Sequence, residues 1–485
     1  MLIFHLYRYF CFFGCVKPLT LKFLYVKIRV LGRLPIFGNR PLWALTMENI
    51  KLSDHFTYKK LYRFVLPSVI MMIFTSIYCV IDGFFISNFI GKTEFAAINL
   101  VWPFLMILGG TGFMIGTGGA AFVTKTIGEG ETEKANRCFS MLIIFTVIFG
   151  AILTALGIAF IRPVSRLLGA DENMIDHCVI YGTTVLAFTA FFMLQNVFQS
   201  FLAAAEKPKL GLYVTILAGV ANAALDALFI VVFKWKLVGA ALATGIGQVI
   251  GGILPLFYFA RKNGSLLKLV KTKIDFKIIL KVCGNGSSEL LTNIASSIVS
   301  MLYNLQLMKF FGEDGVSAYG VLMYVQLVFL AIEIGFSMGS APIISYNYGA
   351  ANKAELKNVF KKSIISMSVA GVLLSGLAQL LAVPLAKLFV GSYPALLDLT
   401  ITAFRMFSFA FIFSGITIYS SGFFTALNNG AVSAILSFAR SLVFQSIFVL
   451  TFTAEIIWWA AFATEVCAFI TATIFFIVMR KRYGY

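Results

Sequence analysis

Residues 89–97, FIGKTEFAA, return in altered form 221 positions later as residues 310–318, FFGEDGVSA. The same separation places Gly128 opposite Gly349. A resemblance that persists at one fixed separation is typical of an internal repeat. The chain is therefore predicted to consist of two homologous halves, and the fold must be one that the same unit can build twice.

The composition is that of a membrane protein. Of the 485 residues, 60% are hydrophobic and 12% are charged, whereas soluble domains average about 45–50% and about 25%. Twelve apolar stretches are each long enough to cross a bilayer as a helix. These stretches are residues 61–90, 95–122, 138–162, 177–204, 210–233, 237–260, 278–311, 316–348, 359–390, 394–426, 430–454 and 457–479.

Six stretches fall in each half, and because six is an even number the two halves enter the membrane in the same orientation. Such parallel repeats are related by an axis along the membrane normal. We predict an all-α polytopic membrane protein whose twelve transmembrane helices form two pseudo-symmetric six-helix bundles around a central cavity.

The domain organisation follows from this pattern. Residues 47–260 form an amino-terminal six-helix lobe, residues 261–277 a basic cytoplasmic loop, and residues 278–485 a carboxy-terminal six-helix lobe with a short basic tail. Residues 1–46 are basic and aromatic and lack a signal-peptide pattern. Either translation begins at Met47, or the extension lies on the inner leaflet as an amphipathic segment. We expect a chain that starts at Met47 to be as active as the full chain.

The net charge is +18. Because the basic residues lie in loops between apolar stretches, we attribute this charge to the orientation of the chain in the bilayer and not to nucleic-acid binding. Lys and Arg concentrate in the loops after even-numbered stretches, in the segment before the first stretch and in the tail. Basic loops stay on the cytoplasmic side. We therefore expect a multi-pass protein of the inner (plasma) membrane with both termini in the cytoplasm.

The sequence predicts no enzyme and no cofactor. The seven cysteines are scattered, mostly within apolar runs, so they read as small hydrophobic residues. Residues 335–339, GFSMG, match the GxSxG pattern of hydrolases. The match lies inside an apolar helix, and no histidine occurs in the carboxy-terminal half, so packing of small residues between helices is the better explanation.

Asp82 is the only charged residue from Phe64 to Ile90. A carboxylate deep in a membrane helix costs roughly 2.5–3.5 kcal/mol on insertion scales, so it needs compensation. Asp226 in the fifth stretch and Thr244 in the sixth are expected at a similar depth at about 1.5 Å per residue.

Residues four apart lie on one helix face, which joins Tyr78 to Asp82 and Asn222 to Asp226. Two explanations are open: a polar knot that ties three helices together, or a cation site in which the two acids bind H⁺ or share Na⁺ with Asn222 and Thr244. The repeat favours the cation site, because the position equivalent to Asp82 holds Tyr303.

The carboxy-terminal half carries charges of its own. Glu333, Arg440 and Glu465 are expected near mid-depth, where an arginine needs a partner, so Arg440 should pair with Glu333 or Glu465. Glu289 has no partner that the sequence suggests, and it is a candidate second proton or substrate site. We treat Glu289, Glu333 and Arg440 as a possible second-lobe site.

Three motifs together resemble the multidrug and toxic compound extrusion (MATE) transporters. They are Leu66-Pro-Ser68 followed by Val80-Ile-Asp82, the stretch NAALDALFI at residues 222–230, and GAALAT at residues 239–244. The resemblance covers residues 56–480. It implies two six-helix lobes that exchange small organic, often cationic, drugs for H⁺ or Na⁺ by alternating access.

The resemblance is to the DinF-like branch of the family and within it to MepA-like exporters. It implies a coupling site of Asp82, Asn222, Asp226, Thr244 and Tyr78, able to bind Na⁺ or H⁺, with Asn196 and Gln199 as a supporting network. It further implies antibiotic efflux by a monomer with no cofactor. Ser414 stands where NorM-like members carry an aspartate, which disfavours a NorM-type Na⁺ site in the second lobe.

A second functional class is a flippase of lipid-linked oligosaccharides or peptidoglycan precursors from the same superfamily. Pyrophosphate lipids require several cavity arginines, because phosphate favours bidentate donors. The sequence offers Arg405 and Arg440 in the membrane, both in the second half. We keep this function as the alternative.

Overall fold

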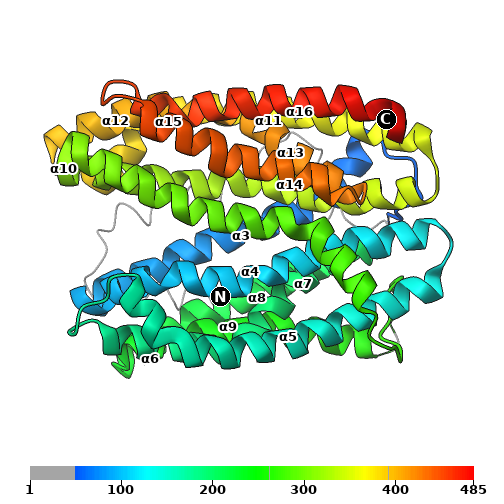
Figure 1. Cartoon of the computed structure of the whole chain (residues 1–485), viewed down its shortest axis with the longest axis horizontal. Helices are drawn as coiled ribbons and strands as arrows, with labels where there is room; N and C mark the ends of the chain where they lie inside the picture. Colours follow the sequence, from blue (N-terminus) through cyan, green and yellow to red (C-terminus); the bar gives the residue numbers. More distant parts are fainter. Residues whose placement is uncertain (1–49, 262, 392) are drawn as a thin grey trace, which may run out of the picture. The chain divides into compact units, whose positions relative to one another are not determined.

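The computed structural model describes residues 50–261, 263–391 and 393–485, and this part of the chain is almost entirely helical, without strands. Figure 1 shows two bundles. The elements of the amino-terminal lobe are α3 (Tyr58–Phe89), α4 (Lys92–Gly128), α5 (Thr132–Leu167), α6 (Ile175–Leu186), α7 (Thr189–Ala204), α8 (Pro208–Asp226), η2 (Ala227–Val232) and α9 (Lys236–Ala260).

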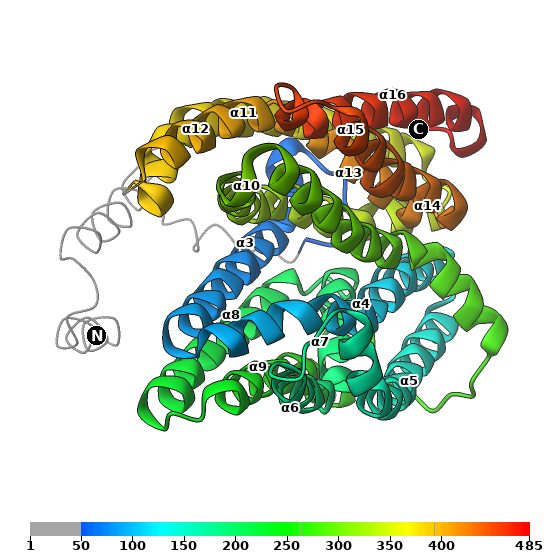
Figure 2. The same ribbon diagram turned by 60° about the vertical axis from the view of Figure 1, so that its left-hand side comes forward.

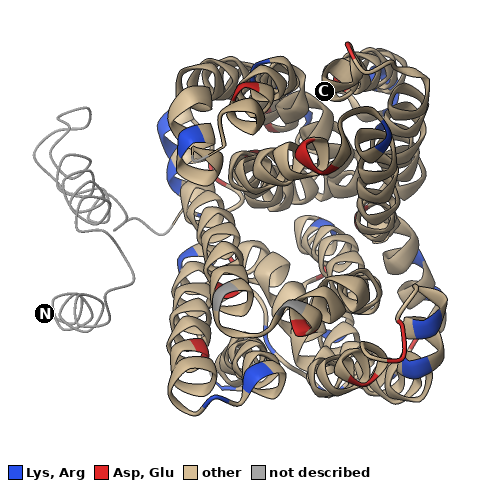
Figure 3. Cartoon of the chain, turned by 90° about the vertical axis from the view of Figure 1, so that its left-hand side faces the viewer, with Lys and Arg blue, Asp and Glu red and all other residues tan. Residues whose placement is uncertain are grey.

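The second lobe begins with the longest helix. Its elements are α10 (Phe276–Gly349), α11 (Lys353–Val390), α12 (Pro394–Ser408), α13 (Phe411–Ala426), α14 (Gly430–Phe438), η3 (Ala439–Phe444), α15 (Gln445–Thr451), η4 (Ile457–Trp459) and α16 (Ala460–Tyr483). Figure 3 looks along the helices and shows that charged residues are sparse on both bundles. The expected all-α membrane fold with two repeated halves is confirmed.

The number of spans agrees with twelve once α10 is divided. Among the described residues, nine helices and two bent helix pairs have the length and apolarity of membrane spans. The 74-residue α10 departs from helical geometry at Gly312, whose φ is 63° and ψ −148°. This left-handed φ, which glycine adopts without strain, joins two consecutive spans.

Two stretches that the sequence presents as single helices are broken. Residues 177–204 form α6 and α7, bent by 51°, and residues 394–426 form α12 and α13, bent by 50°. The breaks fall at Phe188 and Phe409, which are 221 residues apart. A Cβ atom on Gly245 would overlap the Phe188 ring, so this ring fills a space that only glycine leaves open. Because the two breaks lie at equivalent positions, each half of the repeat contains one broken helix at the same place.

Glycines allow the two lobes to touch closely. A Cβ atom on Gly128 would overlap the Tyr346 carbonyl of α10, and one on Gly349 would overlap the Lys125 carbonyl of α4. The two contacts are equivalent under the repeat, because Gly128 corresponds to Gly349 and Lys125 to Tyr346, each at a separation of 221 residues. Gly335, the first residue of GFSMG, likewise packs against Val69 of α3. Figure 2 shows α3 beside α10. The motif serves helix packing.

The segment before α3 fastens the first helix to the second lobe. Leu52 and Phe56 are fully buried among residues of α10 and α11. Glu355 of α11 accepts hydrogen bonds from the Phe56 N–H at 2.8 Å and from the Asn358 amide at 2.8 Å. Its second oxygen lies 2.6 Å from His55 Nδ1.

Replacing Glu355 with alanine should lower the free energy of unfolding by about 1–3 kcal/mol, because the Phe56 N–H would be left buried without an acceptor. The measurement is thermal unfolding of the purified protein in detergent. Lys357→Ala is the matched control, since Lys357 lies on the exposed face of the same helix turn. Equal stability of Glu355→Ala and Lys357→Ala would contradict the expected role of this contact.

Candidate functional site

In the amino-terminal lobe, α3 and α8 bring two carboxylates together. The Asp82 carboxyl lies near the Asp226 carboxyl and the Asn222 amide, but the Asn222 side chain forms no hydrogen bond with it. Asp226 is fully buried and Asn222 is 4% exposed, whereas Asp82 is half-buried. The structure therefore brings together three of the residues that the sequence suggested.

Small residues and a wide helical turn allow this approach. A Cβ atom on Gly219 of α8 would lie 3.0 Å from the Tyr78 ring, so glycine lets α8 pack against α3 at this level. Gly247 of α9 faces the Asn222 side chain in the same way. Directly after Asp226 the α-helix gives way to η2, a π-helical segment. Such π-segments are frequent at functional sites.

The polar atoms of this pocket lack partners. Asp82 Oδ1, both side-chain polar atoms of Asn222 and both carboxyl oxygens of Asp226 are buried without a hydrogen bond. Among the ion pairs of the described residues, none involves either aspartate. Two uncompensated carboxylates in a low-dielectric pocket need a proton or a cation between them.

The donor set suits a hard cation or a proton. Carboxylate and amide oxygens are ligands for hard cations, and they also hold a shared proton. The described residues contain no cluster of three or more His, Cys, Asp or Glu of the kind that holds a transition metal. The chemistry of Asp82, Asn222 and Asp226 is thus compatible with H⁺ or Na⁺, and Thr244 lies half-buried on the neighbouring α9.

Three amide side chains of α7 are buried, two of which were expected from the sequence. Asn196 and Gln199 are buried on α7, at 2% and 7% exposure. Gln195 of the same helix lies near Tyr78. Gln195 also packs against Gly251 of α9. The sequence missed Gln195 because consecutive residues of a helix look alike in a pattern, and only the rotation of α7 selects which one faces α3.

In the carboxy-terminal lobe, Arg440 pairs with Glu465. Arg440 Nε and Nη2 both donate to Glu465 Oε1, at 2.8 and 2.7 Å. Thr417 donates to the other oxygen of Glu465 at 2.5 Å. Of the two partners that the sequence left open, Glu465 is the one observed. Glu333 instead accepts a hydrogen bond from Ser414 at 2.8 Å.

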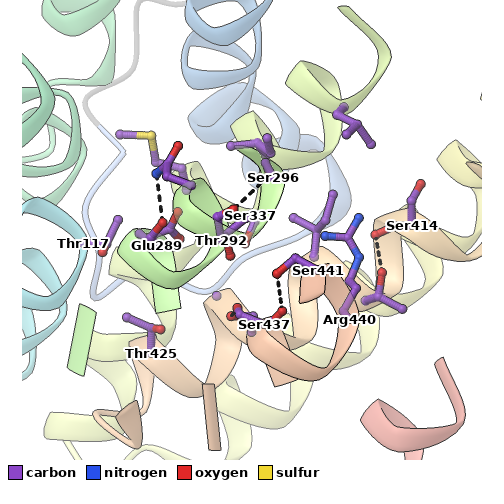
Figure 4. Close-up of a pocket in the computed structure, with 18 of the residues that line it drawn as sticks. Thr117, Glu289, Thr292, Ser296, Ser337, Ser414, Thr425, Ser437, Arg440 and Ser441 are labelled. Carbon is purple, nitrogen blue, oxygen red and sulfur yellow. Dashed lines mark hydrogen bonds between the residues drawn. The ribbon is translucent and has the colours of Figure 1, made fainter. Parts of the chain in front are cut away.

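A cavity of about 430 Å³ lies between the lobes. Figure 4 shows Glu289 on α10 and Arg440 on η3 among its lining residues, with the hydroxyl side chains of Thr292 and Ser337 in the same wall. Met72 of α3 completes the lining from the first lobe, together with residues of α4 and α7. Arg405, the other membrane arginine, is exposed on α12 and outside this lining.

Comparison with known proteins identifies the fold. The MatE family model matches residues 67–228 and again residues 290–451. The chain belongs to the MatE family of transporters. The two matches correspond to the two halves of the repeat, and together they cover most of both lobes.

Several MatE relatives are named multidrug exporters. The multidrug export protein MepA of Staphylococcus haemolyticus is 26% identical over 425 residues, which are 85% of this chain and 92% of the relative. MepA of Staphylococcus aureus is 24% identical over 435 residues, covering 88% of this chain and 94% of the relative. The sequence-based resemblance to MATE transporters and to MepA-like members is confirmed.

Solved MATE structures share the fold. An outward-facing multidrug resistance MATE transporter superposes with a TM-score of 0.81 at 21% identity, over 91% of this chain and 98% of the other. A transporter from Pyrococcus furiosus, described as having a binding pocket of reverse polarity, superposes with a TM-score of 0.80 at 21% identity, over 88% and 96%. At this level of identity, the solved structures show that the chain shares their fold.

Proposed function

We propose that this MatE protein is a secondary active multidrug efflux transporter that exchanges small organic compounds, often cationic, for H⁺ or Na⁺. The observation that carries the proposal is that Asp82 Oδ1 and both carboxyl oxygens of Asp226 lie near one another, buried and without a hydrogen-bond partner, in a protein of this family. The printed names of the MepA relatives support drug-like substrates.

Coupling follows from the charge of the pocket. With a proton or Na⁺ bound, the Asp82–Asp226 pocket is close to neutral, and α3 can pack tightly against α8. Without the cation, repulsion between the two acids loosens this contact and reshapes the cavity between the lobes. Cation and drug then favour opposite states of one two-state element, which is the requirement for exchange.

Glu289 supplies the negative charge of the drug cavity in this proposal. It is half-buried on α10 and lines the cavity, whereas Arg440 and Glu465 neutralise each other. A cationic compound of moderate size can bind beside Glu289, against the apolar side chains of Met72 and Phe411. Loose recognition by such side chains accounts for a broad range of substrates.

Transport into sealed vesicles tests the proposal. Purified protein is reconstituted, and export of a fluorescent organic cation is measured under a pH gradient, under a sodium gradient and under neither. We expect export under at least one gradient and no concentration of the dye without a gradient. Equal dye movement with and without gradients would contradict secondary active transport, and the gradient that drives export identifies the coupling ion.

The flippase alternative has less support in the cavity. A pyrophosphate headgroup needs several arginine donors, and the described cavity lining contains one arginine, which is already paired with Glu465. Scrambling of a lipid-linked oligosaccharide in vesicles at a rate independent of any ion gradient is the result that would favour a flippase.

A further inference from the structure

Glu333 occupies an unusual position in the carboxy-terminal lobe. It lies on α10, is fully buried, and its Oε1 accepts one hydrogen bond, from the Ser414 hydroxyl of α13 at 2.8 Å. Its Oε2 is buried without any partner. An ionised carboxylate offers about four acceptor sites, so three-quarters of the usual solvation is missing here.

The nearby charges do not neutralise Glu333. Two charged groups lie close enough to act on it: Glu465 from α16 and Arg440 from η3. Arg440 Nε and Nη2 both donate to Glu465, and not to Glu333. The Thr417 hydroxyl donates a further hydrogen bond to Glu465. One arginine faces two acids, so the cluster is electrically balanced only if Glu333 is neutral.

The repeat shows that this cluster is not a requirement of lobe packing. The positions equivalent to Glu333 and Arg440 in the first lobe are Gly112 and Gly219, at the separation of 221 residues. Gly112 lies against the Met193 backbone and Gly219 against the Tyr78 ring. The same architecture is thus built in the first lobe without these charges.

Ser414 connects Glu333 with the cavity. Its side chain lines the cavity between the lobes, while its hydroxyl donates to Glu333. A hydroxyl in this position can pass its proton to the carboxylate and take another from a hydronium ion in the cavity, which becomes water. One proton is thus taken up for each carboxylate that is neutralised. Ser414 alone therefore links the cavity to the buried carboxyl group of Glu333.

We propose that Glu333 is a proton-binding site of the carboxy-terminal lobe and that it exchanges its proton with the cavity through Ser414. The site goes beyond the proposed coupling through Asp82 and Asp226, because it lies in the other lobe and contacts neither aspartate. The chain then holds acid–base sites in both halves, each built at positions that the repeat does not share.

Infrared spectroscopy tests the proposal without any need for transport. The carbonyl stretch of a protonated carboxylic acid is recorded for protein in lipid vesicles at neutral pH. The background variant is Asp82→Asn/Asp226→Asn, which removes the first-lobe acids from the signal. We expect a protonated-acid band in this background and its loss when Glu333→Gln is added.

The matched control adds Glu289→Gln to the same background, since Glu289 is the other acid on this wall of α10. The band should persist in that variant. A band that is absent from the background, or that disappears with Glu289→Gln and survives Glu333→Gln, overturns the proposal. Because no drug or gradient is involved, either result is independent of whether the protein exports drugs.

Ser414→Ala provides a second test that keeps the acid in place. The protonated-acid band should remain, and its shift upon transfer into deuterated water should slow by about tenfold, which corresponds to a barrier raised by about 1.4 kcal/mol. Ser408→Ala on the neighbouring α12 is the control, because Ser408 is buried and bonded to Gln379 away from Glu333. Exchange at the same rate in Ser414→Ala and Ser408→Ala overturns the role of Ser414.

Discussion

Replacing Asp82 with asparagine should lower gradient-driven export by roughly 5–150-fold, the range that a coupling free energy of about 1–3 kcal/mol spans. Asparagine has the size and hydrogen-bonding capacity of a protonated aspartate, but it cannot release a proton or bind Na⁺ as an anion. The pocket beside Asp226 would then stay in its cation-bound form. We expect the variant to fold and to bind substrate with no dependence on pH or sodium.

The measurement is export from vesicles under the driving gradient, normalised to the amount of folded protein, together with dye binding as a function of pH and sodium. Asp398→Asn is the matched control, because Asp398 is exposed on α12. Wild-type export by a well-folded Asp82→Asn protein would contradict coupling through this pocket. A loss of export in both variants would indicate a general effect of removing a carboxylate.

Replacing Arg440 with methionine should destabilise the protein by about 3–5 kcal/mol, the effect of removing one partner of a buried ion pair. Glu465 would keep its hydrogen bond from Thr417 but lose both donors from Arg440. Methionine keeps the apolar stem of arginine but lacks its guanidinium group. The loss therefore combines the uncompensated charge of Glu465 with the volume of the missing guanidinium.

A second substitution separates charge from packing. Adding Glu465→Gln to Arg440→Met removes the unpaired charge, so thermal stability in detergent should recover in part. The control Arg405→Met changes an exposed arginine on α12, and it should leave the unfolding temperature near that of the wild type. Two results would contradict the expected contribution of the ion pair to stability. One is equal unfolding temperatures for Arg440→Met and Arg405→Met; the other is a further fall in unfolding temperature when Glu465→Gln is added to Arg440→Met.

The candidate site could be predicted in part because some of its features are local. Asp82 stands out as a lone charge in an apolar run, and Asn222 and Asp226 share a helix face at a separation of four residues. Both facts are visible along the chain. The position of Gln195 near Tyr78 and the choice of Glu465 as the partner of Arg440 depend on the rotation of neighbouring helices. No spacing within one helix contains that information.

The sequence by itself determined the membrane class, the two homologous halves and the twelve spans, because apolar length and a fixed repeat distance are properties of the chain alone. Only the tertiary structure decided where helices break and which acids meet. At one break, the Phe188 ring occupies the space that Gly245 of another helix leaves open. Glu333 is left without a charged partner because Arg440, on a third helix, faces Glu465. Such outcomes arise from packing between helices, where a rotation of one residue changes every contact.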